Sequence, residues 1–253
     1  MSAARRDRHA PDVPGPSPTL PPEHRRRWLV RTVVAVAVVL GLIAGGPWVY
    51  AQLLAPEAAA PLALQTPAPT LAREVAPSVA PADLDGAWTV QPDSEAGYRL
   101  DEVLSGQDVT VVGRTTEVAG SMTVADGSLT AAQVTVDVAS IATDESARDA
   151  YFRRAMDTTA NPEATFVLEQ PVDVQALAAT AEAVPVEAVG ALTLHGVTRP
   201  VTAQLEMRRT AAGVEVAGSI PVTLTDFGLT APDLGFVTVQ PAGLVEMRLL
   251  LSR

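Results

Sequence analysis

The side chains in this chain that could do chemistry are few, and their spacing suits no common catalytic or metal site. Beyond residue 24 the 253-residue chain has one histidine, His195. A Ser–His–Asp triad would have to use it, and no Gly-x-Ser-x-Gly elbow is present. The stretch Asp83–Gly86 begins like a calcium loop but lacks the later ligands. We therefore predict no catalytic residue and no metal site.

The remaining ionisable side chains also lack a catalytic arrangement. His195 precedes a glycine, which indicates a turn or a strand end; contact with the polar head group of a ligand is the alternative role. Asp101 and Glu102 are adjacent, as are Asp144 and Glu145. Successive side chains on a strand point to opposite faces, so Asp101 and Glu102 cannot share a site there. We interpret all four carboxylates as solvated surface.

Two residue types are missing, and each absence removes a class of chemistry. The chain has no Cys, which excludes disulfides and thiol nucleophiles, and its 18 basic residues are all Arg, which excludes Schiff bases and Walker-type phosphate loops. Residues 1–80 hold eight Arg against five acids, whereas the rest holds ten Arg against 24 acids. Such an acidic body should repel nucleic acid. The sequence predicts no enzyme, no cofactor and no nucleic-acid partner.

The N-terminal region predicts a membrane anchor. Residues 1–31 form an Arg- and Pro-rich tail, and residues 32–50 carry no charge. Nineteen residues at 1.5 Å each span about 28 Å, close to the hydrocarbon thickness of a bilayer. The preceding Arg25–Arg27 cluster predicts a cytoplasmic N-terminus. A single-pass signal anchor in a bacterial cytoplasmic membrane is the first prediction, and a signal peptide cleaved after Ala51 is the alternative. Both place the body outside the cytoplasm.

Residues 51–83 are rich in Ala and Pro and are expected to form a linker. Pro-rich linkers are extended and semi-rigid, at about 3.1 Å per residue. Residues 55–82 could therefore hold the body up to about 90 Å from the membrane. We assign this segment no role beyond that of a spacer.

Residues 84–253 show the period of two that is typical of half-buried strands. The alternation is clear in Val134–Val138 and Val245–Leu251, and Asp126–Gly127 is a strong hairpin signal. About eight or nine strands with no βαβ pattern predict an all-β sandwich or closed barrel. Residues 144–156 have helical spacing instead, so one short inserted helix is expected. An eight-stranded barrel with an aliphatic interior can hold a small apolar ligand.

Several ordered motifs add a family resemblance to this pattern. They are Trp88-Thr89-Val90 followed by Ser94-Glu95-Ala96-Gly97-Tyr98-Arg99, the stretch Val136–Asp144, the stretch Gly190–Val201, and Asp226-Phe227-Gly228-Leu229. Together they resemble the YceI-like proteins, lipocalin-like barrels that bind polyisoprenoid lipids. The resemblance covers about residues 86–252. It implies an extended antiparallel lipocalin-like β-barrel of about eight strands with one short inserted helix. The uncharged run at residues 32–50 adds a single N-terminal transmembrane helix before this barrel.

The resemblance also implies an apolar tunnel that holds an isoprenoid tail. Strand alternation and the family's helix then give the expected ligand-binding residues, which are Tyr98, Val136, Val138, Tyr151, Phe152, Phe166, Leu168, Leu192, Leu194, Ile220, Val222 and Phe227. Possible head-group contacts are Arg99, Arg114, Arg199 and His195. Ordinary core packing is the competing interpretation for each lining residue.

Two functions of different classes follow from these features. The first is an extracytoplasmic carrier, tethered through residues 32–50, for a long isoprenoid such as menaquinone or polyprenyl phosphate. The acidic body favours the quinone. The second is a non-enzymatic envelope interaction module, a filled barrel that binds a protein partner or a cell-envelope polymer.

Overall fold

The computed structural model describes residues 58–65, 83–233 and 235–253. Within them the chain forms eleven strands, two α-helices and two 3-10 turns. The strands are β1 (Gly86–Val90), β2 (Glu95–Leu104), β3 (Gln107–Thr115), β4 (Val118–Ala125), β5 (Ser128–Asp137), β6 (Glu163–Leu168), β7 (Val172–Asp173), β8 (Val184–Leu194), β9 (Val197–Thr210), β10 (Gly213–Thr223) and β11 (Val237–Ser252). The helical elements are η1 (Val138–Ser140), α2 (Ser146–Ala155), α3 (Gln175–Ala179) and η2 (Leu224–Phe227).

The strands close into an antiparallel barrel with eight positions. The sheet order is β1-β4-β5-β6-β8-β9-β10-β11-β2-β3, and β1 also pairs with β11. Strand β11 is flanked by β10 on one side and by both β1 and β2 on the other. Strands β1 and β2 together fill the position next to β11. Strands β3 and β4 together fill the following position, because β3 pairs with β2 and β4 pairs with β1. The predicted all-β barrel of about eight strands is confirmed.

Two tight turns show how the sequence fixes strand register. Asp126 and Gly127 join β4 to β5 with φ of 51° and 72°, the left-handed backbone that a two-residue hairpin requires. His195 and Gly196 join β8 to β9 in the same way, with φ of 51° and 71°. The hairpin at Asp126–Gly127 and the turn position of His195 are both as predicted.

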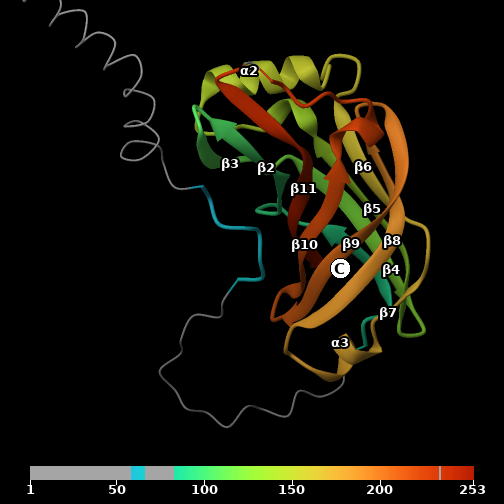
Figure 1. Ribbon diagram of the computed structural model, residues 1–253. Coiled ribbons are helices and arrows are strands. Elements are labelled where there is room, and N and C mark those ends of the chain that lie inside the picture. Colours follow the sequence, from blue (N-terminus) through green and yellow to red (C-terminus); the bar gives the residue numbers. More distant parts are fainter. Residues whose placement is uncertain (1–57, 66–82, 234) are drawn as a thin grey trace, which may run out of the picture. The chain divides into compact units, whose positions relative to one another are not determined.

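The barrel interior is filled by one side of each strand. Buried side chains from β4, β6, β8, β9, β10 and β11 form a single apolar cluster, in which Ala203 and Ile220 have no exposed surface. A smaller cluster of Val138, Ile141 and Met156 lies beneath α2. Figure 1 shows α2 across one end of the strands and α3 near the other. The interior is therefore apolar along its length and covered by a helix at each end.

Helix α2 is held by its first turn. Glu145 caps the N-terminus and accepts a hydrogen bond from the backbone N–H of Ala147 at 3.2 Å. Arg148 forms an ion pair with Asp144 at 2.6 Å, one turn earlier. Asp149 accepts from the backbone N–H of Thr143 at 2.8 Å and from its hydroxyl at 2.7 Å. The predicted inserted helix is confirmed, and Glu145 is its N-cap.

The predicted transmembrane segment, residues 32–50, lies outside the described residues. No helix in the described part of the chain is long and apolar enough to cross a membrane. Of the predicted linker, Ala58–Gln65 and Asp83 are described. This short segment lies against the barrel, as detailed below.

Candidate functional site

The first candidate site is an apolar pocket beneath α2, here named the helix-side pocket. It has a volume of about 90 Å³ and is bounded by β2, β8 and β11 together with α2 and the η1 turn. Its lining includes Tyr98, Val136, Val138, Phe152, Met156, Leu192, Leu194, Val222 and Val245. Phe152 stacks on Tyr98 with ring centroids 4.9 Å apart and an interplanar angle of 18°. The helix therefore closes this pocket through an aromatic pair.

A second pocket of about 50 Å³, here named the second pocket, lies further along the same interior. Its lining includes Met122, Val134, Phe166, Leu168, Ala188, Leu205, Met247 and Leu249. No charged side chain lines either pocket. Among the described residues there is also no group of three or more His, Asp or Glu that could hold a metal ion. The interior is therefore suited to holding an apolar molecule.

Two buried side chains lie where the lining of the interior changes from one pocket to the other. The ring of Phe166 lies against Gly190, where its Cζ is 2.6 Å from the position that a Cβ would take. On either side of Gly190 along β8, Ala188 lines the second pocket and Leu192 the helix-side pocket. Ile220 is fully buried on β10, between residues that line the two pockets. Phe166 on β6 and Ile220 on β10 are thus buried at the strand levels between the two linings.

A small polar rim borders the helix-side pocket, on β2 and α2. Glu102 follows Leu100 on the inward face of β2 and is 8% exposed. Arg148 lies between two carboxylates, 3.9 Å from Glu102 and 2.6 Å from Asp144. Burial raises the pKa of Glu102, an effect that Arg148 only partly opposes. Burial likewise raises the pKa of the Tyr98 hydroxyl to about 12, so that group stays neutral.

The buried position of Glu102 corrects the sequence prediction for this residue. Asp101 is exposed and accepts a hydrogen bond from Thr110 at 2.8 Å, as a surface residue would. Glu102 points the other way, toward the interior, where α2 covers it. Strand alternation correctly separated the two side chains, but nothing local in the sequence showed that a helix would cover one of them. The helical spacing of residues 144–156 was the available signal.

The structure brings most of the predicted lining residues together. Tyr98, Val136, Val138, Phe152, Leu192, Leu194 and Val222 line the helix-side pocket, whereas Phe166 and Leu168 line the second. Ile220 is fully buried between them. Phe227 is buried in η2 and lines a hollow on the outside, next to Arg199 and Pro200. Tyr151 is 41% exposed, because neighbouring residues of a helix face different directions and Phe152 takes the inward one.

The four predicted head-group residues do not converge on the apolar interior. Arg99 and Arg114 point outward, and both form ion pairs with Glu246, at 2.8 and 2.7 Å. Arg199 donates to the backbone carbonyl of Asp226 at 2.8 Å. His195 Nδ1 lies 3.2 Å from the carbonyl oxygen of Phe227. Arg99 and Arg114 alternate with the inward-facing residues of β2 and β3, so both point outward and neither reaches the rim. The strand pattern in the sequence could have predicted this orientation.

Comparison with known proteins identifies the family to which this barrel belongs. The model of the YceI-like domain matches residues 88–250, which run from β1 to β11. The chain belongs to the YceI-like family. Comparison with curated protein sequences gave no significant match.

Two solved structures share the fold of this YceI-like domain. One is a polyisoprenoid binding domain from Saccharophagus degradans implicated in plant cell wall breakdown, with 19% identity and a TM-score of 0.50 over 65% of this chain and 97% of that one. The other is BcnA of Burkholderia cenocepacia, also with 19% identity and a TM-score of 0.50, over 65% of this chain and 99% of that one. At this identity the likeness concerns the fold.

Proposed function

We propose that the barrel is a non-enzymatic carrier for a long isoprenoid lipid. The observation that carries this proposal is the pair of apolar pockets in line along the barrel, with no charged lining side chain. The family membership and the polyisoprenoid binding named for the Saccharophagus degradans domain support it. Burial of a CH₂ group contributes about 0.8 kcal/mol, so about ten buried carbons suffice for tight binding.

The polar rim favours a neutral head group. Asp144, 2.6 Å from Arg148, already neutralises its charge, which leaves little attraction for a phosphate. Tyr98, with its pKa of about 12, supplies a neutral hydroxyl donor, and the raised pKa of Glu102 makes its protonated, donating form more accessible than that of an exposed glutamate. These groups suit the carbonyl oxygens of a quinone such as menaquinone better than a polyprenyl phosphate.

The tail has to displace side chains as it enters. An apolar cavity of about 150 Å³ is large enough for benzene. The two pockets, of about 90 and 50 Å³, are each smaller than that. Phe166 and Ile220 are therefore the side chains whose movement would join the two spaces into a tunnel.

We further propose that the carrier works outside the cytoplasmic membrane and is tethered to it through residues 32–50. The uncharged run and the Arg cluster before it support this location. The mass of the mature N-terminus would distinguish a retained anchor from cleavage after Ala51.

Native mass spectrometry of the full chain, purified from bacterial membranes, tests the carrier function. We expect a co-purifying isoprenoid, and uptake of added menaquinone by the delipidated protein. Leu192→Trp, which fills the helix-side pocket, should reduce uptake at least tenfold. Val167→Trp adds the same ring at a 42% exposed position of β6 and is the matched control.

Failure of the unsubstituted protein to carry or take up any isoprenoid would contradict the carrier function. Leu194→Trp, at a less buried position of the same pocket, provides a second blocking variant if Leu192→Trp does not fold. Equal uptake by the two blocking variants and the Val167→Trp control would show that the lipid binds elsewhere.

The small size of the pockets also favours a second candidate, a filled barrel that serves as an interaction module in the cell envelope. This function predicts no lipid uptake and leaves partner binding intact in Leu192→Trp. Uptake of menaquinone that the pocket variants block would exclude it as the main role.

A further inference from the structure

A short piece of the predicted linker lies against the outer face of the barrel. Residues 58–65, with the sequence Ala-Ala-Ala-Pro-Leu-Ala-Leu-Gln, lie outside the barrel in Figure 1 and contact side chains of β2, β3, β9 and β10. Arg99 Nη2 donates to the carbonyl oxygen of Ala59 at 2.7 Å, and Arg114 Nη2 donates to that of Ala60 at 3.0 Å. The outward arginines of β2 and β3 thus hold the first half of the segment by its backbone.

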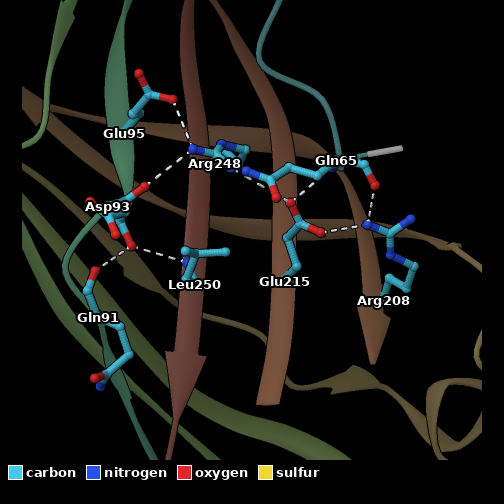
Figure 2. Close-up of polar contacts among 9 residues, drawn as sticks. Gln65, Gln91, Asp93, Glu95, Arg208, Glu215, Arg248 and Leu250 are labelled. Carbon is cyan, nitrogen blue, oxygen red and sulfur yellow. Dashed lines mark hydrogen bonds and ion pairs between the residues drawn. The ribbon is translucent and has the colours of Figure 1, made fainter. Parts of the chain in front are cut away.

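The other end of the segment is held by a second pair of charged groups. The backbone N–H of Gln65 donates to Glu215 Oε1 at 2.9 Å, and Arg208 donates to the carbonyl oxygen of Gln65. Figure 2 shows both contacts, with Glu215 between Arg208 and Arg248. Four main-chain hydrogen bonds to charged side chains therefore fix the two ends. Hydrogen bonds to charged groups are stronger than those between neutral groups.

The charged groups that hold the segment are themselves anchored. Glu246 lies on the outward face of β11 yet is 2% exposed, and it pairs with both Arg99 and Arg114. Glu215, on the outward face of β10, is 2% exposed and pairs with Arg208 at 2.6 Å. Carboxylates on the outside of a barrel are rarely so buried, and these are buried where the segment lies. The ion pairs orient the arginine donors toward the segment backbone.

The middle of the segment meets a hollow on the outer face of the barrel. Leu62 and Ala63 line a space of about 460 Å³ together with Pro185, Gln204 and Ala217 from β8, β9 and β10. Glu187 and Glu206 also border this hollow. Leu62 is half-buried there, whereas Ala63 is exposed. Of the two segment residues that line the hollow, Leu62 has the larger apolar side chain, and a negative charge in its place would meet two carboxylates.

We propose that residues 58–65 form an intramolecular clasp, which binds this outer groove and shortens the membrane tether. The groove is an interaction surface for an extended apolar segment, recognised through its backbone, and its occupant is the chain's own linker. With the clasp closed, residues 51–57 alone separate the predicted anchor from the docked segment. At about 3.1 Å per residue their reach is about 20 Å, against about 90 Å for an unattached linker. The tether length rests on the anchor of the proposed function; the clasp does not.

Pulsed electron–electron resonance on the full chain in lipid nanodiscs tests the clasp. The protein has no native Cys, so Ala63→Cys and Ala131→Cys give two unique spin-label sites, one on the clasp and one at an exposed position of β5. We expect a single narrow distance distribution. Adding Leu62→Asp should broaden it at least twofold, whereas Leu62→Met, which conserves volume, should not.

A broad distribution in the chain with Leu62 intact, or no response to Leu62→Asp, would overturn the clasp. Both labels follow Ala51, so anchor cleavage does not alter this result and is read separately from the mass of the N-terminus. Energy transfer from a dye on residue 131 to dyes in the nanodisc lipids tests the tether length. Efficiency should fall in Leu62→Asp; unchanged efficiency in an uncleaved chain would overturn the short tether.

Discussion

At the scale of single residues, the position of Glu102 shows how an ionisable group can become part of a ligand site. Its neighbour Asp101 is exposed, whereas Glu102 lies under α2 beside Arg148. Burial makes the charged carboxylate unfavourable and raises its pKa. The native state therefore holds this proton more tightly than the unfolded chain does, and Glu102 can donate a hydrogen bond at a pH where an exposed glutamate cannot.

This raised pKa predicts a pH-dependent effect of Glu102→Gln. Between the ordinary glutamate pKa of about 4.3 and the raised value, the native state binds more protons than the unfolded state. The unfolding free energy of the wild type should therefore fall as pH rises through that window. Glu102→Gln lacks this loss, so its stability relative to wild type should increase from pH 4 to pH 7.

Urea denaturation at a series of pH values measures this difference. Asp101→Asn makes the same kind of change at the exposed neighbour and is the matched control. A relative stability of Glu102→Gln that stays constant or declines toward neutral pH would show that Arg148 outweighs burial at this site.

Much of the interior could be predicted at this scale, because side chains alternate strictly along a strand. Val136, Leu192 and Val222 line the helix-side pocket as that parity predicts. Glu102 could not be placed so simply, since its burial depends on a helix more than forty positions later in the chain. Arg99 and Arg114 obey the same alternation, but their partners are Glu246 on β11 and a linker segment, both distant in sequence. Local sequence patterns cannot predict contacts between residues so far apart in the chain.

At the scale of secondary-structure elements, α2 is the cover of the helix-side pocket. It has no fully buried residue of its own, and it meets the barrel mainly through Phe152 and its C-cap residue Met156. Tyr151 and Phe152 are adjacent but diverge, the first exposed and the second stacked on Tyr98. The helical spacing in the sequence predicted α2. Which of the two rings faces the barrel depends on the rotation of the helix about its own axis.

Phe152→Ala is therefore expected to loosen α2 without unfolding the barrel. Loss of the stacked pair removes an aromatic contact of about 1 kcal/mol in addition to the buried ring area. Amide hydrogen exchange should accelerate across residues 146–155 by tenfold or more while β8–β11 stay protected. Tyr151→Ala, at the exposed neighbouring position, should leave exchange in α2 within a factor of three. Equal acceleration in both variants would mean that Phe152 does not hold the helix.

At the scale of the whole molecule, the barrel interior is packed with side chains and contains two small apolar pockets. The two apolar pockets have linings that share no residue, and Phe166 and Ile220 are buried at the strand levels between them. A packed partition stabilises the fold, whereas a long ligand needs it to open. Smaller side chains at these two positions should therefore lower the free energy of unfolding and increase the uptake of a long lipid.

Phe166→Ala tests whether a loss of stability accompanies a gain in lipid uptake. The substitution should join the two pockets and lower the unfolding free energy by about 3–5 kcal/mol, the usual cost of removing a buried ring. The same variant should take up menaquinone faster than wild type when the delipidated protein is followed by native mass spectrometry. Bound lipid should then restore part of the lost thermal stability, because a ligand that binds only the native state stabilises it. Slower uptake would show that Phe166 supports the tail rather than blocking it.

The pairing of β1 with β11 has a consequence for the order of events during biosynthesis. Thr89 pairs with Ser252 and Val90 with Leu251, and the Arg253 guanidinium lies 4.8 Å from the centre of the Trp88 ring. Strand β1 thus has β4 as one neighbour and, as the other, β11, the strand most distant from it in the sequence of the barrel. Closing so long a loop is slow compared with forming local hairpins. The barrel therefore cannot close until β11 is available to pair with β1.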